Sequence, residues 1–212
     1  PDSWRLRGTA LHIAAYVAAG FVAAALAVTA LDVYTDFRPD SSLVQTWTLL
    51  PQIAVVIGLV YVGYVRASRT FWVLGSLVGL VLIEETFHVL NPIEIALRGM
   101  VERISDGSGI DQGIVNGLLV YGLVALIGLG FLAYSLVGAS KSGREVALNI
   151  AFLLAIGWFF GGPVSVMSRA DDGRFLAFVE EVGEAIVFAL LAGYVVGLVY
   201  AAHGARVTDR NG

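Results

Sequence analysis

Long apolar runs alternate with short polar segments along the whole chain. Six runs reach about the 20 residues that an α-helix needs to cross the hydrocarbon core of a bilayer. They cover approximately residues 9–31, 46–65, 70–90, 113–138, 146–167 and 175–202. The pattern predicts an all-α, polytopic membrane protein, with residues 1–212 forming a single transmembrane domain of six helices.

The segment between the third and fourth runs is amphipathic. Asn91-Pro92 is typical of a helix start, with Asn as the N-cap and Pro as the first helical residue. Apolar residues from Ile93 to Ile104 then fall on one helical face, and glutamate and arginine side chains take the other. Because this segment is too short to cross a bilayer, we expect an interfacial helix over residues 92–104.

The distribution of charge predicts the orientation in the membrane. Six spans place both termini on the same side of the bilayer. The basic residues of that side are Arg5, Arg7, Arg66, Arg69, Lys141, Arg144, Arg206 and Arg210, against the acids Asp2, Glu145 and Asp209. By the positive-inside rule this side is the cytoplasm. We therefore expect an inner-membrane protein with cytoplasmic termini and an acidic outer half.

Composition supports this class and excludes others. The chain is 58% hydrophobic and 14% charged, whereas soluble domains average about 25% charged residues. It has no cysteine, so disulfides and thiolate metal sites are excluded. A net charge of −4 without a basic tract argues against nucleic-acid binding. The lipid bilayer is the expected partner, and a homo-oligomer or a larger membrane complex stays open.

Two acidic motifs interrupt the third and sixth apolar runs. The first contains Glu84, Glu85 and His88, and the second contains Glu180, Glu181 and Glu184. Each ionisable side chain costs about 2.5–3.5 kcal/mol at the centre of a membrane helix, so the motifs call for a functional or structural reason. At a rise of 1.5 Å per residue both lie roughly 10 Å below the outer surface. If the two helices are neighbours, the side chains converge.

Convergence would make a metal site. Carboxylates and one imidazole, without sulfur, suit Fe, Mn or Zn. Glu-x-x-His on a bundle helix is also the ligand pattern of ferritin-like di-iron and di-manganese proteins. This chain has one such motif instead of two, so the likeness is one of chemistry and not of family. The candidate metal ligands are Glu84, Glu85, His88, Glu180, Glu181 and Glu184.

Three other interpretations stay open. A proton- or cation-coupled transporter could use the same carboxylates. The motifs are 96 residues apart (180 − 84) and each lies in the third span of a triplet, as in a 3+3 inverted repeat. A metal-dependent enzyme, such as an oxidase or hydrolase, is less favoured, because the sequence offers no separate nucleophile or substrate pocket. A non-catalytic subunit could instead contain a structural layer of ion pairs. The residues that could support the ligands or form ion pairs with the glutamates are Asp32, Gln52, Asp111, Asn116, Arg169 and Arg174.

A Gly-Gly-Pro segment, several aromatic residues and one histidine add predictions about the ends of the spans. Gly161-Gly162-Pro163 predicts a kink or an early end of the fifth span. Tyr61, Tyr64 and Trp72 are typical of an aromatic belt at the cytoplasmic interface. His203, near the cytoplasmic end of the last span, is interpreted as an interfacial residue.

Overall fold

The computed structural model describes residues 6, 8–35, 43–87, 89–164, 166–167 and 174–210. Within this part of the chain 92% of the residues are helical and there are no strands. The all-α fold class predicted from the sequence is therefore confirmed.

The helices follow one another with short connections. They are α1 (Thr9–Thr35), α2 (Leu43–Val65), α3 (Arg69–Phe87), α4 (Asn91–Ser108), α5 (Gln112–Leu136), α6 (Lys141–Phe159), the π-helical segment η1 (Phe160–Val164) and α8 (Arg174–Arg210). Among the described residues, four stretches are long and apolar enough to cross a membrane: Thr9–Val28, Gln112–Leu136, Lys141–Val164 and Phe178–Gly204. These helices are compatible with a membrane-embedded protein.

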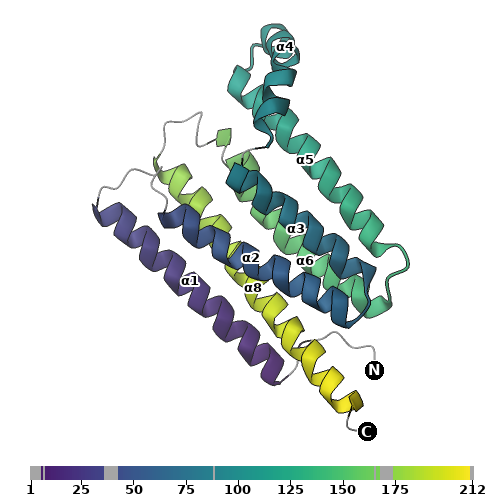
Figure 1. The fold of residues 1–212 in the computed structure, drawn as a ribbon. Helices are drawn as coiled ribbons and strands as arrows, with labels where there is room; N and C mark the ends of the chain where they lie inside the picture. The colour runs from purple at the N-terminus through teal and green to yellow at the C-terminus, as the bar shows by residue number, and fades with distance from the viewer. Residues whose placement is uncertain are drawn as a thin grey trace.

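The long helices lie side by side and alternate in direction (Figure 1). Helices α1, α2 and α8 form one side of the bundle, α5 forms the other, and α3 and α6 lie between them. Helix α4 projects beyond the bundle at the end where α3 finishes and α5 begins. The start of α1 and the end of α8 lie at the opposite end. The two ends of the bundle therefore differ in structure.

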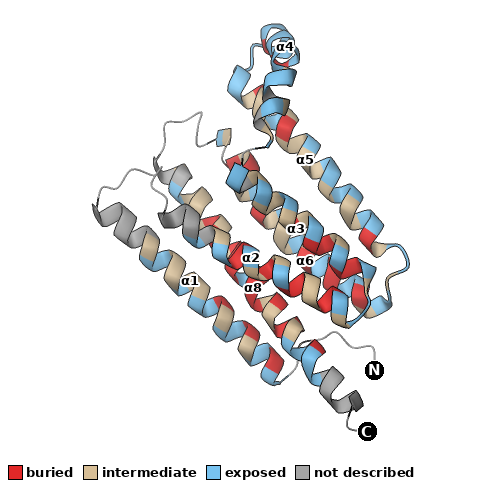
Figure 2. Ribbon diagram, in the orientation of Figure 1, coloured by how far each residue is buried: buried red, intermediate tan, exposed pale blue. Residues whose placement is uncertain are grey.

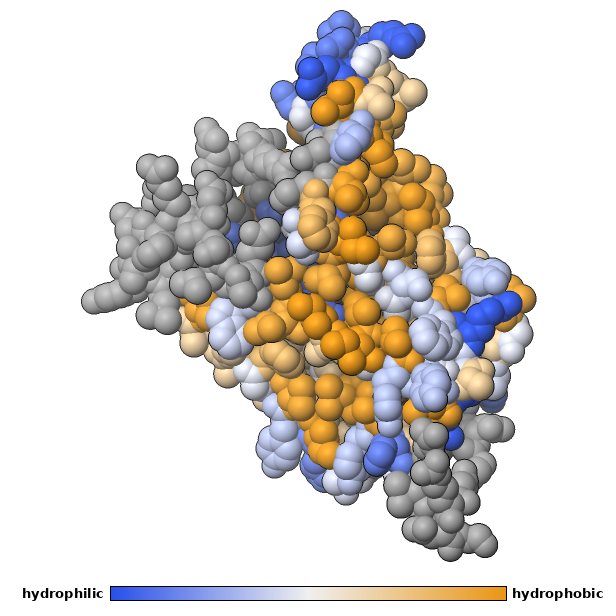
Figure 3. Space-filling view, viewed as in Figure 1, coloured by the Kyte–Doolittle hydropathy of each residue, from blue (hydrophilic) through white to orange (hydrophobic). Residues whose placement is uncertain are grey.

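The core forms where α2, α3, α6 and α8 meet. Leu59, Leu74, Ile150 and Leu191 come from these four helices and are fully buried. Buried positions concentrate there in Figure 2, whereas much of α1 and α5 is exposed. On the face drawn in Figure 3, apolar side chains gather over the middle of the bundle, and polar ones gather over α4. An apolar exterior is unusual for a water-soluble protein but suits contact with lipid.

Small residues bring α1 and α8 together. An ideal Cβ built on Gly193 would overlap the carbonyl oxygen of Ala14 and the side chain of Ala18. One built on Gly197 would crowd the side chain of Ala14 and the backbone of Ala10 in the same way. This small-xxx-small spacing on both helices lets the backbones approach closely, which is how apolar helices gain packing energy where lipid competes for their surfaces.

A polar clamp joins the start of α3 to the end of α5. Thr70 Oγ1 donates a hydrogen bond to the carbonyl oxygen of Ser135 (3.0 Å), and both residues are buried. Arg69 Nη2 donates to the carbonyls of Tyr134 (3.3 Å) and Val137, and the guanidinium lies 4.4 Å from the centre of the Tyr134 ring. The last carbonyls of a helix have no partner within it, so the clamp satisfies groups that α5 alone leaves exposed.

Two helix ends test the local predictions. Helix α6 gives way to η1 at Phe160, so the predicted break at Gly161-Gly162-Pro163 takes the form of a π-helical turn. The assignment of Asn91 as the N-cap of α4 is wrong: Leu90 is the N-cap and makes no side-chain bond, Asn91 is already helical, and the helix runs to Ser108. The N–H of Leu90 is instead bonded to a side chain of α3, Glu84.

We expect Gly193→Leu to destabilise the protein, because its side chain must force the backbones of α1 and α8 apart. Over-packing of this kind costs about 1–3 kcal/mol or more. Thermal unfolding in detergent measures the loss. Gly20→Leu on α1 is the matched control, since a Cβ there meets no atom within 4 Å. Equal unfolding temperatures for the two variants would contradict the proposed role of the small residues.

Candidate functional site

The two acidic motifs lie at the α4 end of the bundle. Glu84 belongs to the last turn of α3, and the stretch from Glu180 to Glu184 belongs to the second and third turns of α8 (Figure 1). The side chains of Glu84, Glu180, Glu181 and Glu184 are all half-buried. The Glu85 side chain and the whole of His88 lie outside the described residues.

Glu84 connects α3 to α4. Its carboxylate oxygen Oε2 accepts a hydrogen bond from the backbone N–H of Leu90, at 2.8 Å. The first N–H groups of a helix have no partner inside it, and a negative charge there is also favoured by the helix dipole. Glu84 thus does the work that the sequence pattern assigned to Asn91, and it does so from the preceding helix.

Glu184 packs against the π-helical segment. A Cβ built on Gly161 would overlap the Oε1 atom of Glu184, so the carboxylate occupies the space that the missing side chain leaves. One residue earlier on α8, Gly183 makes room in the same way for the ring of Phe160. The side chains of η1 and α8 therefore interlock at two consecutive positions, and a carboxylate lies against backbone whose hydrogen bonding departs from the α-helical pattern.

The two motifs do not lie on adjoining helices. No described residue of α3 comes within 8 Å, Cα to Cα, of a described residue of α8. Helices α2 and α6 each contact both of them and lie between. The condition on which the predicted convergence depended is therefore not met by direct packing. Among the described side chains, no three His, Cys, Asp or Glu residues lie close enough to hold a metal ion.

The carboxylates of α8 are nevertheless engaged. Glu180, Glu181 and Glu184 each interact with a neighbouring group in the protein. Because these three residues occupy little more than one turn of one helix, a ligand set built on them must recruit oxygen or nitrogen atoms from other elements. Helix α8 contacts η1 directly, so η1 is the described element nearest to Glu184.

The remaining candidates divide into three groups. Asp111 is exposed and is the N-cap of α5, where its carboxylate accepts from the N–H groups of Gly113 (2.8 Å) and Ile114 (3.3 Å). Gln52 is fully buried in α2, and Asn116 is half-buried with no hydrogen-bond partner for Oδ1 in the described structure. Arg169 and the side chains of Asp32 and Arg174 lie outside the described residues.

Comparison with known proteins adds no candidate. No protein-family model, no curated protein and no solved structure matches the chain. The chemistry of the site is therefore inferred from its own geometry.

Two polar pairs of neighbouring helices were not predicted from the sequence. The hydroxyl of Tyr61 lies 3.1 Å from Nδ1 of His203, and this contact joins α2 to α8. Asn149 Nδ2 donates a hydrogen bond to the hydroxyl of Tyr194 (3.3 Å), which joins α6 to α8. The sequence indicated these pairs only through single polar residues within apolar runs, because polar side chains in such helices usually form hydrogen bonds to a neighbouring helix. The interpretation of His203 as interfacial is consistent with its exposed position.

We expect Glu84→Ala to loosen the start of α4 by about 1 kcal/mol, which is typical for loss of a helix cap. Hydrogen exchange at the Leu90 amide should then be about fivefold faster. Glu84→Gln keeps an acceptor oxygen and should retain most of the protection. Glu102→Ala, on the exposed face of α4, is the control. Unchanged exchange at Leu90 in Glu84→Ala would show that the bond contributes nothing to α4.

Proposed function

We propose that this chain is an integral membrane protein of six apolar helices that binds a divalent metal ion in the α4 half of the bundle. Glu184 is the central ligand, with Glu181 and Glu180 on the same helix as further ligands or supporting groups. Glu85 of α3 and His88, the residue that follows α3 in the sequence, are the proposed additional ligands. Mn, Fe and Zn are the ions that this combination of carboxylate and imidazole groups suits.

The contact of Glu184 with Gly161 is the observation that carries this proposal. Helices broken at membrane depth commonly line ion sites, because the interrupted backbone offers carbonyl oxygens that the helix no longer uses. Single π-helical turns likewise concentrate at functional sites. In this chain a carboxylate lies on such a turn, at a glycine that leaves it room.

A bound cation would also account for the negative charge that α8 carries in apolar surroundings. A carboxylate in apolar surroundings is costly unless it is paired or coordinates a metal. The α8 motif places three carboxylates within five residues, and Glu181 and Glu184 are three residues apart and share a helical face. A divalent ion would offset the repulsion within this group.

Glu84 is assigned a different role. Its bond to the Leu90 N–H supports the alternative in which part of the acidic layer is structural. We therefore place Glu84 outside the ligand set, as the group that positions α4 over the end of α3.

Transport is the second candidate, favoured by the order of neighbours in the bundle. Let α1, α2 and α3 of the first triplet correspond to α5, α6 and α8 of the second. When the two triplets are exchanged, every pair of long helices in contact becomes another pair in contact; for example, α1–α8 becomes α5–α3. A 3+3 inverted repeat has this property. The pairs differ in extent, since α1 packs on α8 more extensively than α5 packs on α3.

The six-span arrangement has a direct test. Helix α2 has 23 residues and α3 has 19, or about 34 and 28 Å at 1.5 Å per residue, close to the thickness of a bilayer core. We expect reporters inserted after Ser140 and at the C-terminus to lie in the cytoplasm, and one inserted after Gly109 to lie outside. A cytoplasmic reporter after Gly109 would refute this topology.

Elemental analysis of the purified protein tests the metal site. We expect a near-stoichiometric transition metal in the wild type, and about a tenfold or greater loss of affinity in Glu184→Gln, as for groups that hold a metal ligand in place. Gly161→Ala should also weaken binding, because its methyl group displaces the carboxylate without changing the charge. Gly122→Ala on α5 is the control, since a Cβ there meets no atom within 4 Å.

The same measurement separates the alternatives. Loss of metal in Glu85→Gln and His88→Ala would bring the α3 motif into the site, and normal metal content would exclude it. Metal uptake by sealed vesicles, abolished by Glu184→Gln, would favour transport over a fixed site. Absence of metal from the wild type, even after incubation with Mn, Fe and Zn, would refute metal binding and favour a structural layer.

A further inference from the structure

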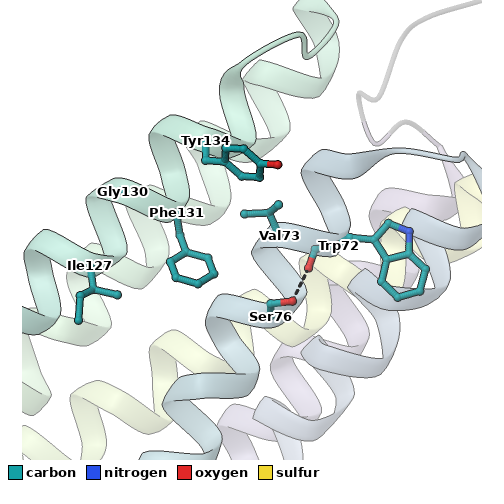
Figure 4. A pocket seen from close by; sticks show the side chains of 7 residues that line it. All are labelled: Trp72, Val73, Ser76, Ile127, Gly130, Phe131 and Tyr134. Carbon is teal, nitrogen blue, oxygen red and sulfur yellow. Dashed lines mark hydrogen bonds between the residues drawn. The ribbon is translucent and has the colours of Figure 1, made fainter.

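An open hollow lies between α3 and α5, at the end of the bundle opposite the acidic motifs. Its volume is about 540 Å3, within the range of about 300–1,000 Å3 of pockets that hold small ligands. Its walls are drawn in Figure 4 and include Trp72, Val73 and Ser76 of α3 and Ile127, Phe131 and Tyr134 of α5. The hollow faces outward and lies on the surface that the proposed bilayer would cover.

The chemistry of the hollow is apolar. The hydroxyl of Ser76 donates to the carbonyl oxygen of Trp72 within its own helix (3.0 Å), and the other polar groups of the lining side chains are the indole N–H of Trp72 and the hydroxyl of Tyr134. The occupant therefore meets mainly rings and alkyl groups along the walls. Gly130 also lines the hollow, and a Cβ there would meet no atom within 4 Å, so this glycine keeps the space open.

Positive charge gathers at one end of the hollow. The guanidinium of Arg69 lies over the Tyr134 ring, and both of its hydrogen bonds are donated by Nη2. Nη1 and Nε make no hydrogen bond to the described residues. The two adjoining turns, residues 66–69 and 137–145, hold Arg66, Arg69, Lys141 and Arg144 against a single acid, Glu145. Hydrophilic residues mark this corner of the molecule in Figure 3.

We propose that the hollow binds an anionic phospholipid. One acyl chain lies along α3 and α5, and the phosphate lies at Arg69 with Lys141 and Arg144 nearby. Basic clusters at the cytoplasmic ends of membrane helices attract anionic headgroups in this way. A second hollow of about 520 Å3 lies on the other side of Trp72, where Tyr61 and Tyr64 form part of its wall, and it receives the second chain. This inference rests on the proposed membrane embedding and is independent of the metal.

The first experiment fills the hollow. Gly130→Leu places a side chain where the acyl chain would lie, without a clash within the protein, and Gly128→Leu on another face of α5 is the matched control. Native mass spectrometry of protein purified in mild detergent counts bound lipid. We expect a tightly bound anionic phospholipid on the wild type and on Gly128→Leu, and its loss from Gly130→Leu. Metal content should be the same in all three, so failure of one proposal is separable from failure of the other.

The second experiment tests the headgroup. We titrate dioleoyl phosphatidylglycerol and dioleoyl phosphatidylcholine, which share acyl chains and differ in charge. The wild type should prefer the anionic lipid, and Lys141→Gln with Arg144→Gln should weaken its binding by about tenfold or more. Arg98→Gln with Arg103→Gln removes the same charge from α4, at the other end, and should leave binding unchanged. Arg69 itself is not substituted, because it supports the end of α5.

Three results would overturn the proposal. Lipid retention by Gly130→Leu equal to that of the wild type would show that the hollow is not the site. Equal affinity for the two lipids would remove the headgroup interaction. Conversion of a dimer into a monomer by Gly130→Leu, with no bound lipid on the wild type, would show that the hollow instead receives a second copy of the chain.

Discussion

Backbone polar groups at helix ends must find partners, and this constraint accounts for most of the polar contacts of the bundle. Within an apolar bundle or a bilayer, an unsatisfied N–H or C=O costs several kcal/mol. The end of α5 is satisfied by Arg69 and Thr70 of α3, and the start of α4 by Glu84 of the same helix. Both ends of α3 therefore support the ends of other helices. The charged side chains Arg69 and Glu84 therefore have a structural role, which is to form hydrogen bonds with backbone groups at helix ends.

The long helices have no large polar faces, so their packing depends on how closely their backbones can approach. Where neighbouring surfaces are as apolar as lipid, close approach is the main source of attraction. Gly193 and Gly197 provide it between α8 and α1, and Gly58 lets α2 approach Val195 of α8. Helix α8 thus packs closely against both α1 and α2, and the carboxylates that it carries are placed by packing along its length.

The sequence predicts the helical class because apolar runs of membrane length have no other stable form in lipid. It also predicts the break at Gly161, where Gly-Gly-Pro cannot continue an α-helix. The N-cap of α4 was missed because Glu84, six residues upstream, outcompetes the local Asn91. The relation of α3 to α8 was missed for a different reason: a helix that is apolar all round gives no sign of which face meets which neighbour.

Glu184 differs from Glu84 and Asp111 because it does not lie at a helix end. Glu84 and Asp111 both accept from N–H groups at helix starts, which is reason enough for their charge. Glu184 lies inside α8, where every backbone N–H has an intrahelical partner, and it faces a segment whose helical register has changed. Backbone capping within its own helix therefore does not explain this carboxylate. Its packing against η1 depends on the glycine at position 161, because a side chain there would take the space that the carboxylate occupies.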